Sequence, residues 1–149
     1  MSRNVPASIH EIQTPALILD ARALGRNIAR MAAFFASGPC RLRPHFKAHK
    51  TPENAKRQLA AGSCTGVTCA TVGEAEIAAM FCDDILLANE IVAPDKCARV
   101  ASLAKRVRMT AAVDSLAGVV PLSVAARGGG VSIGVLVDLN VGQGRCGVE

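Results

Sequence analysis

The sequence predicts an α/β fold built around a parallel sheet. Helix signals and strand signals alternate along most of the 149 residues. One strand signal, residues 85–88, is the continuous apolar run that is typical of a parallel strand buried on both faces. Hydrophobic residues make up 50% of the chain, which is enough to bury a core at this length. These observations argue against a disordered chain.

The first half of the chain begins with a polar preface, residues 1–13. Asp20 is the predicted N-cap of the first helix, and Gly38 with Pro39 ends it. Thr71, with Glu74 three residues later, forms the capping box of another helix. The expected elements are helix 20–37, strand 40–47, helix 51–61, strand 66–70 and helix 71–81.

The second half repeats the same alternation. Pro94 suits the first turn of a helix, and Asp114 is the predicted N-cap of the next one. Pro121 lies inside that helix, so a kinked or short helix is expected. The expected elements are strand 85–88, helix 94–106, strand 109–113, a helix from 114, a glycine turn at 128–130 and strand 131–138.

Five strand and helix units suggest either a (β/α)₈ TIM-type barrel or an open doubly wound sheet. Neither architecture is complete in this chain, because a barrel needs about eight strands to close. A half barrel leaves unpaired backbone groups at two sheet edges. We therefore expect an incomplete barrel, as a truncated product, an N-terminal fragment or one part of an obligate assembly.

Composition narrows the classes of partner and location. The formal charge is +5 and the pI is near 9.1, which permits binding of phosphate-bearing molecules without selecting among them. The chain has no Tyr or Trp, which weakens the case for nucleic acid binding by base stacking. The sequence shows neither a signal peptide nor a membrane span, so a cytoplasmic, soluble protein is expected. Six cysteines without a C-x-x-C pair are expected to be reduced, and most of them buried.

The predicted strand 40–47 carries the residues with the clearest chemical potential. Side chains alternate between the two faces of a strand, so four basic residues share one face and apolar residues share the other. The basic residues are Arg41, Arg43, His45 and Lys47. In a barrel this face points inward, and Lys47 lies nearest the carboxyl end, where active sites are found. Nearby cations and desolvation favour the neutral amine that attacks a carbonyl, although a solvent-facing basic edge strand gives the same pattern.

These residues also carry a resemblance to a known family. Residues 43–51, R-P-H-F-K-A-H-K-T, resemble the cofactor-lysine motif of the D-threonine aldolase and eukaryotic-type D-serine dehydratase family, within the alanine racemase fold type. Residues 14–20, 83–90 and 138–148 agree with the same family in order and spacing. Two positions depart from the usual family pattern, Ala48 in place of threonine and Asn140 in place of an acidic residue. The resemblance covers residues 14–149 and implies a partial alanine racemase-like N-terminal barrel domain.

The resemblance implies a cofactor and its partners. Lys47 is expected to hold pyridoxal 5'-phosphate as a Schiff base, and Arg145 to approach the ring oxygen of the cofactor. His45 is a further candidate for cofactor contact, or has a structural role. His49 and Lys50 fall in the loop above the barrel mouth, and Asn89 ends a strand. A divalent metal is expected only in the full-length enzyme, bound by a C-terminal β domain, so no metal ligand is assigned here.

The activity that the resemblance implies is a pyridoxal-phosphate-dependent lyase acting on D-3-hydroxy amino acids. Cleavage between Cα and Cβ, as in D-threonine aldolase, is favoured. D-serine dehydratase-like elimination, racemisation on the same fold and a non-catalytic remnant are the alternatives. The complete enzyme is expected to be a homodimer that binds neither nucleic acid nor membrane. This chain by itself is expected to be poorly active or inactive.

Two other patterns compete with that interpretation. Gly142-x-Gly144-x-x-Gly147 follows a predicted strand and matches the dinucleotide fingerprint of an oxidoreductase. The chain offers no following helix or acidic residue to complete that motif. His45 and His49 have the spacing of a helical zinc site, but Pro44 and the strand pattern argue against a helix there.

Overall fold

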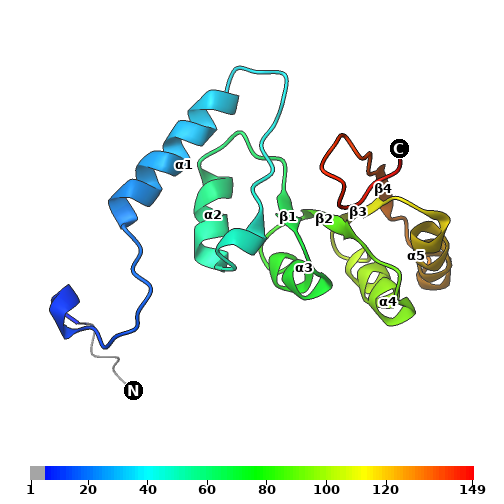
Figure 1. Ribbon diagram of the computed structural model, residues 1–149, viewed down its shortest axis with the longest axis horizontal. Helices are drawn as coiled ribbons and strands as arrows, with labels where there is room; N and C mark the ends of the chain where they lie inside the picture. Colours follow the sequence, from blue (N-terminus) through cyan, green and yellow to red (C-terminus); the bar gives the residue numbers. More distant parts are fainter. Residues whose placement is uncertain (1–5) are drawn as a thin grey trace.

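The computed structural model describes residues 6–149, which form one four-stranded parallel sheet with helices packed along it (Figure 1). The strands are β1 (Val67–Cys69), β2 (Asp84–Glu90), β3 (Arg108–Val113) and β4 (Gly134–Val137). They lie side by side in sequence order, and each pairs in parallel with the next. A doubly wound sheet reverses its strand order at a switch point, whereas a barrel does not. The observed order therefore matches part of a barrel.

The helices connect successive strands and cover the sheet. Figure 1 shows α3, α4 and α5 side by side on the same side of the sheet. The α-helices are α1 (Ala21–Phe35), α2 (Pro52–Ala60), α3 (Val72–Ala78), α4 (Pro94–Leu103) and α5 (Leu116–Gly129), and the short 3₁₀ turns are η1 (Ile9–Glu11) and η2 (Phe46–Ala48). All five predicted helices are thus confirmed.

The helix ends follow the predicted caps with one exception. Asp20 accepts hydrogen bonds from the amides of Arg22 and Ala23, each at 2.9 Å, and Thr71 accepts one from the amide of Glu74 at 3.2 Å. The predicted N-cap at Asp114 is wrong, because Ser115 occupies the N-cap position of α5. The Asp114 carboxylate instead accepts a hydrogen bond from the amide of Gly147, at 3.3 Å.

Two further expectations concern prolines. The helix α5 continues past Pro121 for a total of 14 residues, so a short helix is wrong, and a kink at Pro121 stays a prediction. The predicted strand 40–47 is also wrong, since this segment makes only isolated bridges from Leu42 to Cys64 and from His45 to Thr68. Pro44 has no N–H to donate to a ladder, although its carbonyl accepts from the Thr68 amide at 2.9 Å. Beyond His45 the chain turns into η2.

The core lies between the sheet and the helices α3, α4 and α5. Its largest fully buried side chains come mainly from the strands and from η2, and include Phe46, Ile85, Leu87 and Met109. The strand β4 is different, because its three apolar residues Val135, Leu136 and Val137 are 51–64% exposed. The core is therefore centred on β1, β2 and β3, and β4 is an open edge.

The segment before α1 lies away from the sheet (Figure 1). Leu17, Ile18 and Leu19 are among the most exposed apolar side chains of the described residues. Among residues 6–149, no helix is long and apolar enough to cross a membrane.

Candidate active site

A cavity of about 580 Å³ opens at the carboxyl ends of the strands. Its walls come from Ala70 after β1, from the end of β2, from β3 and β4, and from the segment after β4. Lys47 and Arg145 both line it, although 98 positions separate them in the sequence. Parallel strands present their carboxyl ends at the same edge of a sheet, so this is the expected position of a barrel active site.

The turn that carries Lys47 is fixed by a buried aromatic ring. Phe46 is 1% exposed and packs against the rings of His49 and Phe81, with centroid distances of 5.6 and 6.0 Å. The Phe46 carbonyl accepts hydrogen bonds from the amides of His49 at 3.3 Å and Lys50 at 2.8 Å, which closes the turn. Lys47 itself is exposed, and among the described residues it forms no ion pair. Its amine is therefore accessible at the surface of the described residues.

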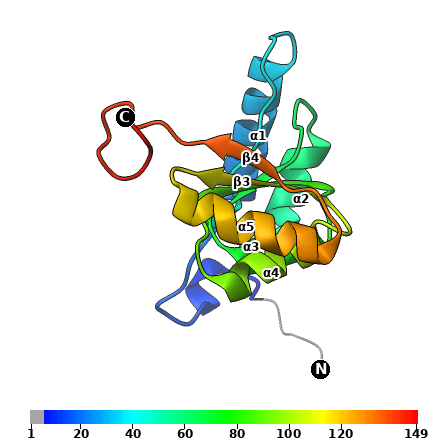
Figure 2. The same ribbon diagram turned by 90° about the vertical axis from the view of Figure 1, so that its right-hand side faces the viewer.

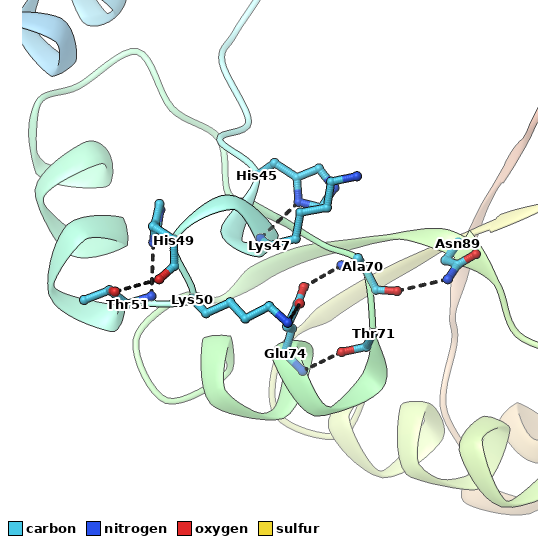
Figure 3. Close-up of polar contacts among 9 residues, drawn as sticks. All are labelled: His45, Lys47, His49, Lys50, Thr51, Ala70, Thr71, Glu74 and Asn89. Atoms are coloured by element: carbon cyan, nitrogen blue, oxygen red, sulfur yellow. Dashed lines mark hydrogen bonds and ion pairs between the residues drawn. The ribbon is translucent and has the colours of Figure 1, made fainter. Parts of the chain in front are cut away.

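His45 lies beside Lys47 but borders a different cavity (Figure 3). Its Nδ1 accepts a hydrogen bond from the Lys47 amide at 3.3 Å, which places His45 at the N-cap of η2. Burial and then the positive charge of Lys47 lower the pKa of His45 below its usual 6.5. Its ring contributes to a second cavity, of about 250 Å³, which α1 and α2 also line. The structure thus places Lys47 and Arg145 on one cavity, and His45 at the start of the turn that carries Lys47.

The predicted inward row of cations is only partly present. Arg41 is exposed, and Arg43 turns to the amino end of β2, where its Nη1 lies 2.9 Å from the Asp84 Oδ1. The same Arg43 nitrogen donates to the Asp84 carbonyl at 3.2 Å. The row is broken because Arg43 finds an anionic partner 41 positions away, a contact that no local pattern indicates. The Arg43 side chain therefore links the segment 40–47 to β2.

Arg145 lies in a glycine-rich loop whose backbone is held by the side chain of Asn140. Figure 2 shows this loop leading away from the sheet and helices. The Asn140 Oδ1 accepts hydrogen bonds from the amides of Gly142 at 3.2 Å and Gly144 at 3.0 Å. Both glycines have a positive φ. In a dinucleotide site such amides face a pyrophosphate at a helix N-terminus, so the oxidoreductase alternative lacks support among residues 6–149.

Three acceptor side chains, which no motif in the sequence indicated, line the cavity together with Arg145. Their possible metal-ligand atoms, from Glu90, Asp138 and Cys146, lie within 4.8 Å of one another. The guanidinium of Arg145 lowers the pKa of Cys146, but a hydrogen bond to Asp138, burial and the two carboxylates together raise it above the usual value. Contact with Cys146 in turn raises the pKa of Arg145. The charge of Arg145 at this group opposes the binding of a metal cation there.

Two further candidate residues, Asn89 and His49, form hydrogen bonds with main-chain groups. The Asn89 Nδ2 donates to the Ala70 carbonyl and its Oδ1 accepts from the Glu90 amide, both at 3.1 Å. The ring nitrogens of His49 contact the Thr51 amide and the Gln58 side chain, each at 3.1 Å. Engaged in this way, His49 is not available for the zinc site that its spacing from His45 suggested.

The donor set at the cavity fits part of pyridoxal 5'-phosphate. Lys47 offers an unpaired amine for an aldehyde, and Arg145 offers a guanidinium for a phenolate oxygen. The carboxylates of Glu90 and Asp138 also line this cavity, and they would repel a phosphate group. The phosphate must therefore be held away from the Arg145 loop.

Several curated proteins, two named as aldolases and one as a dehydratase, are similar in sequence to this chain. The chain is 41% identical over 139 residues to D-threonine aldolase of Arthrobacter sp and 41% identical over 140 residues to 3-hydroxy-D-aspartate aldolase of Paracoccus denitrificans. It is 34% identical over 139 residues to D-threo-3-hydroxyaspartate dehydratase of Delftia sp.. These matches cover 92–93% of this chain and 36% of each relative. The chain thus spans about a third of the length of these relatives.

The fold gives the same relationship. The crystal structure of D-threonine aldolase from Filomicrobium marinum matches with a TM-score of 0.91 and 44% sequence identity, over 95% of this chain and 38% of that one. The family model for the alanine racemase N-terminal domain matches residues 19–149. Three observations point to the same family. They are the parallel strands in sequence order, the position of Lys47 at the cavity by their carboxyl ends, and the matches to known proteins. The chain belongs to the alanine racemase N-terminal domain family and forms part of the barrel domain of that family.

Proposed function

We propose that this chain supplies the lysine-bearing part of a pyridoxal-phosphate-dependent lyase that cleaves D-3-hydroxy amino acids. The observation that carries the proposal is the position of Lys47 and Arg145 on one cavity at the carboxyl ends of parallel strands. The relatives named for aldol cleavage are more similar to this chain than the dehydratase, at 41% against 34% identity. Aldolase activity on D-threonine is therefore preferred over elimination.

The residues of this chain would bind and orient the reacting groups. The Lys47 Nζ would hold the cofactor through its aldehyde carbon, and Arg145 would donate to the neighbouring ring oxygen. The bound cofactor supplies an electron sink for the bond that breaks at the substrate Cα.

The complete activity belongs to a longer protein in this proposal. The chain spans 36% of its curated relatives, and Glu90 and Asp138 make the Arg145 side of the cavity unsuited to phosphate. Partners for the phosphate and for the divalent metal are therefore proposed outside residues 1–149. The 149 residues alone are expected to turn over D-threonine poorly.

A chimera tests the proposal. Residues 1–149 replace the matching part of the Arthrobacter D-threonine aldolase, and the release of acetaldehyde from D-threonine is measured. The chimera should be active, whereas its Lys47→Ala variant should lose essentially all turnover. The isolated chain should release little acetaldehyde. Robust D-threonine cleavage by the isolated chain, or turnover that survives Lys47→Ala, would contradict the proposal.

A further inference from the structure

The carboxylate of Glu74 is the most buried charged group of the described residues, and it lies beneath the Lys47 turn (Figure 3). Glu74 is 6% exposed, in the first turn of α3. A buried carboxylate is costly unless polar partners surround it. The partners of Glu74 are the Ala70 amide, at 2.8 Å from Oε2, and the Lys50 Nζ, at 3.4 Å from Oε1. Both belong to segments at the mouth of the cavity.

The contact with Ala70 shows that Glu74 does more than cap its own helix. In a capping box the N3 glutamate bonds the amide of the N-cap residue, which here is Thr71. Glu74 reaches one residue further back, to the amide of Ala70, which follows β1 and lines the cavity with Lys47. The Ala70 carbonyl is held on its other side by Asn89, at the end of β2. Glu74 therefore fixes the rim of the cavity at the end of β1.

The contact with Lys50 joins this rim to the turn that carries Lys47. The Lys50 amide closes that turn on the Phe46 carbonyl, at 2.8 Å. Lys50 has a φ of +49°, a left-handed conformation that is unfavourable for an L-residue. Such a conformation persists where surrounding contacts hold it. The ion pair with Glu74 and the bond to Phe46 are the contacts that hold Lys50.

We infer that Glu74 is a positioning residue, which acts through Lys50 to hold the Lys47 amine over the end of β1. The inference rests on the proposed role of Lys47. It predicts that loss of the Glu74 charge slows covalent capture of pyridoxal 5'-phosphate by Lys47 roughly tenfold, the lower range for loss of a supporting contact at a reactive group. The Glu74 charge also raises the pKa of His45, against the lowering by burial and by Lys47. Its removal should therefore lower the pKa of His45 further.

The variants separate charge from packing. Glu74→Gln retains an oxygen for the Ala70 amide but loses the ion pair, and Lys50→Met removes the partner charge while keeping a long side chain. Lys50→Arg restores the charge. The matched control is Glu76→Gln on the same helix, because Glu76 is paired with Arg99 at 2.7 Å on the exposed surface. The purified 149-residue chain is incubated with pyridoxal 5'-phosphate, and the rate of borohydride-trapped adduct at Lys47 is measured by peptide mapping.

Glu74→Gln and Lys50→Met should each slow the trapping, and the double variant should be no slower than the slower single variant. Lys50→Arg and Glu76→Gln should trap at the rate of the unaltered chain. The inference is overturned if Glu74→Gln traps at the unaltered rate, or if the two single effects add in the double variant. If Glu74→Gln does not fold, Lys50→Met carries the test, since the Lys50 side chain is 67% exposed.

An NMR measurement separates failure of this inference from failure of the proposed function. An unaltered chain that forms no adduct at Lys47 would contradict the proposed function alone. The titration of His45 and the amide shifts of residues 46–50 then decide the role of Glu74 without the cofactor. Both should change in Glu74→Gln and stay constant in Glu76→Gln. Unchanged signals in Glu74→Gln would overturn the positioning role.

Discussion

At the scale of single residues, the candidates Lys47 and Arg145 both line the same cavity. Lys47 and Arg145 could be identified because each lies in a local motif that resembles a known family. The long-range contacts around the Lys47 segment could not be identified, because Arg43 meets Asp84 and Lys50 meets Glu74 across 41 and 24 positions. Contacts of this kind depend on how the strands are arranged in space, so a local sequence pattern does not indicate them.

The glycines of the Arg145 loop illustrate two separate constraints on a residue. Gly142 and Gly147 have φ angles of +109° and +99°, which cost an L-residue about 1–2 kcal/mol. A Cβ at Gly147 would also lie 2.6 Å from the Asn140 amide nitrogen, whereas one at Gly142 meets nothing within 4 Å. Gly147 therefore carries a steric constraint that Gly142 lacks.

We predict that Gly147→Ala opens the loop and that Gly142→Ala perturbs it less. The collision lies next to the bonds from the Asn140 amide to the Val148 carbonyl, at 2.8 Å, and from the Val148 amide to the Asp138 carbonyl, at 2.9 Å. Hydrogen exchange at these two amides measures the effect. Gly147→Ala should lose their protection, and Gly142→Ala should retain most of it. Equal protection in the two variants would show that φ alone governs the loop.

At the scale of elements, helices could be predicted and the first strand could not. Helix signals are local, since caps and apolar spacing lie within a few residues of each other. The segment 40–47 has the alternation of a strand, and Pro44 and Phe46 are indeed buried. Its pairing fails because a ladder requires donors, which Pro44 lacks, and a partner long enough to pair. The neighbouring β1 has only three residues.

The caps of α3 and α5 allow a matched prediction. The Thr71 hydroxyl accepts from the Glu74 amide, whereas the Ser115 side chain makes no cap bond, and both residues are exposed. Thr71→Ala should lower the free energy of unfolding by ~1 kcal/mol, the usual contribution of a side-chain cap. Ser115→Ala should change it by less than about 0.5 kcal/mol. Urea denaturation followed by circular dichroism distinguishes these outcomes, and equal losses would contradict the difference between the caps.

At the scale of the whole molecule, the alternation of helices and strands predicted the architecture, and strand order decided between its two forms. Alternation alone is equally typical of a barrel and of a doubly wound sheet. The unbroken order from β1 to β4 favours the barrel. The exposed apolar side chains of β4 mark the edge where further strands would continue it. Closure depends on pairing between distant strands, so no segment of the sequence indicates it.

Mapping of a borohydride-reduced adduct shows whether Lys47 is the nucleophile of this cavity. The purified chain is incubated with pyridoxal 5'-phosphate, reduced with borohydride, digested and analysed by mass spectrometry, beside its Lys47→Ala variant. The pyridoxyl group is expected predominantly on Lys47. The Lys47→Ala variant should lose this adduct without gaining another of equal yield. Labelling spread evenly over the lysines, or concentrated on one other than Lys47, would contradict this role of Lys47.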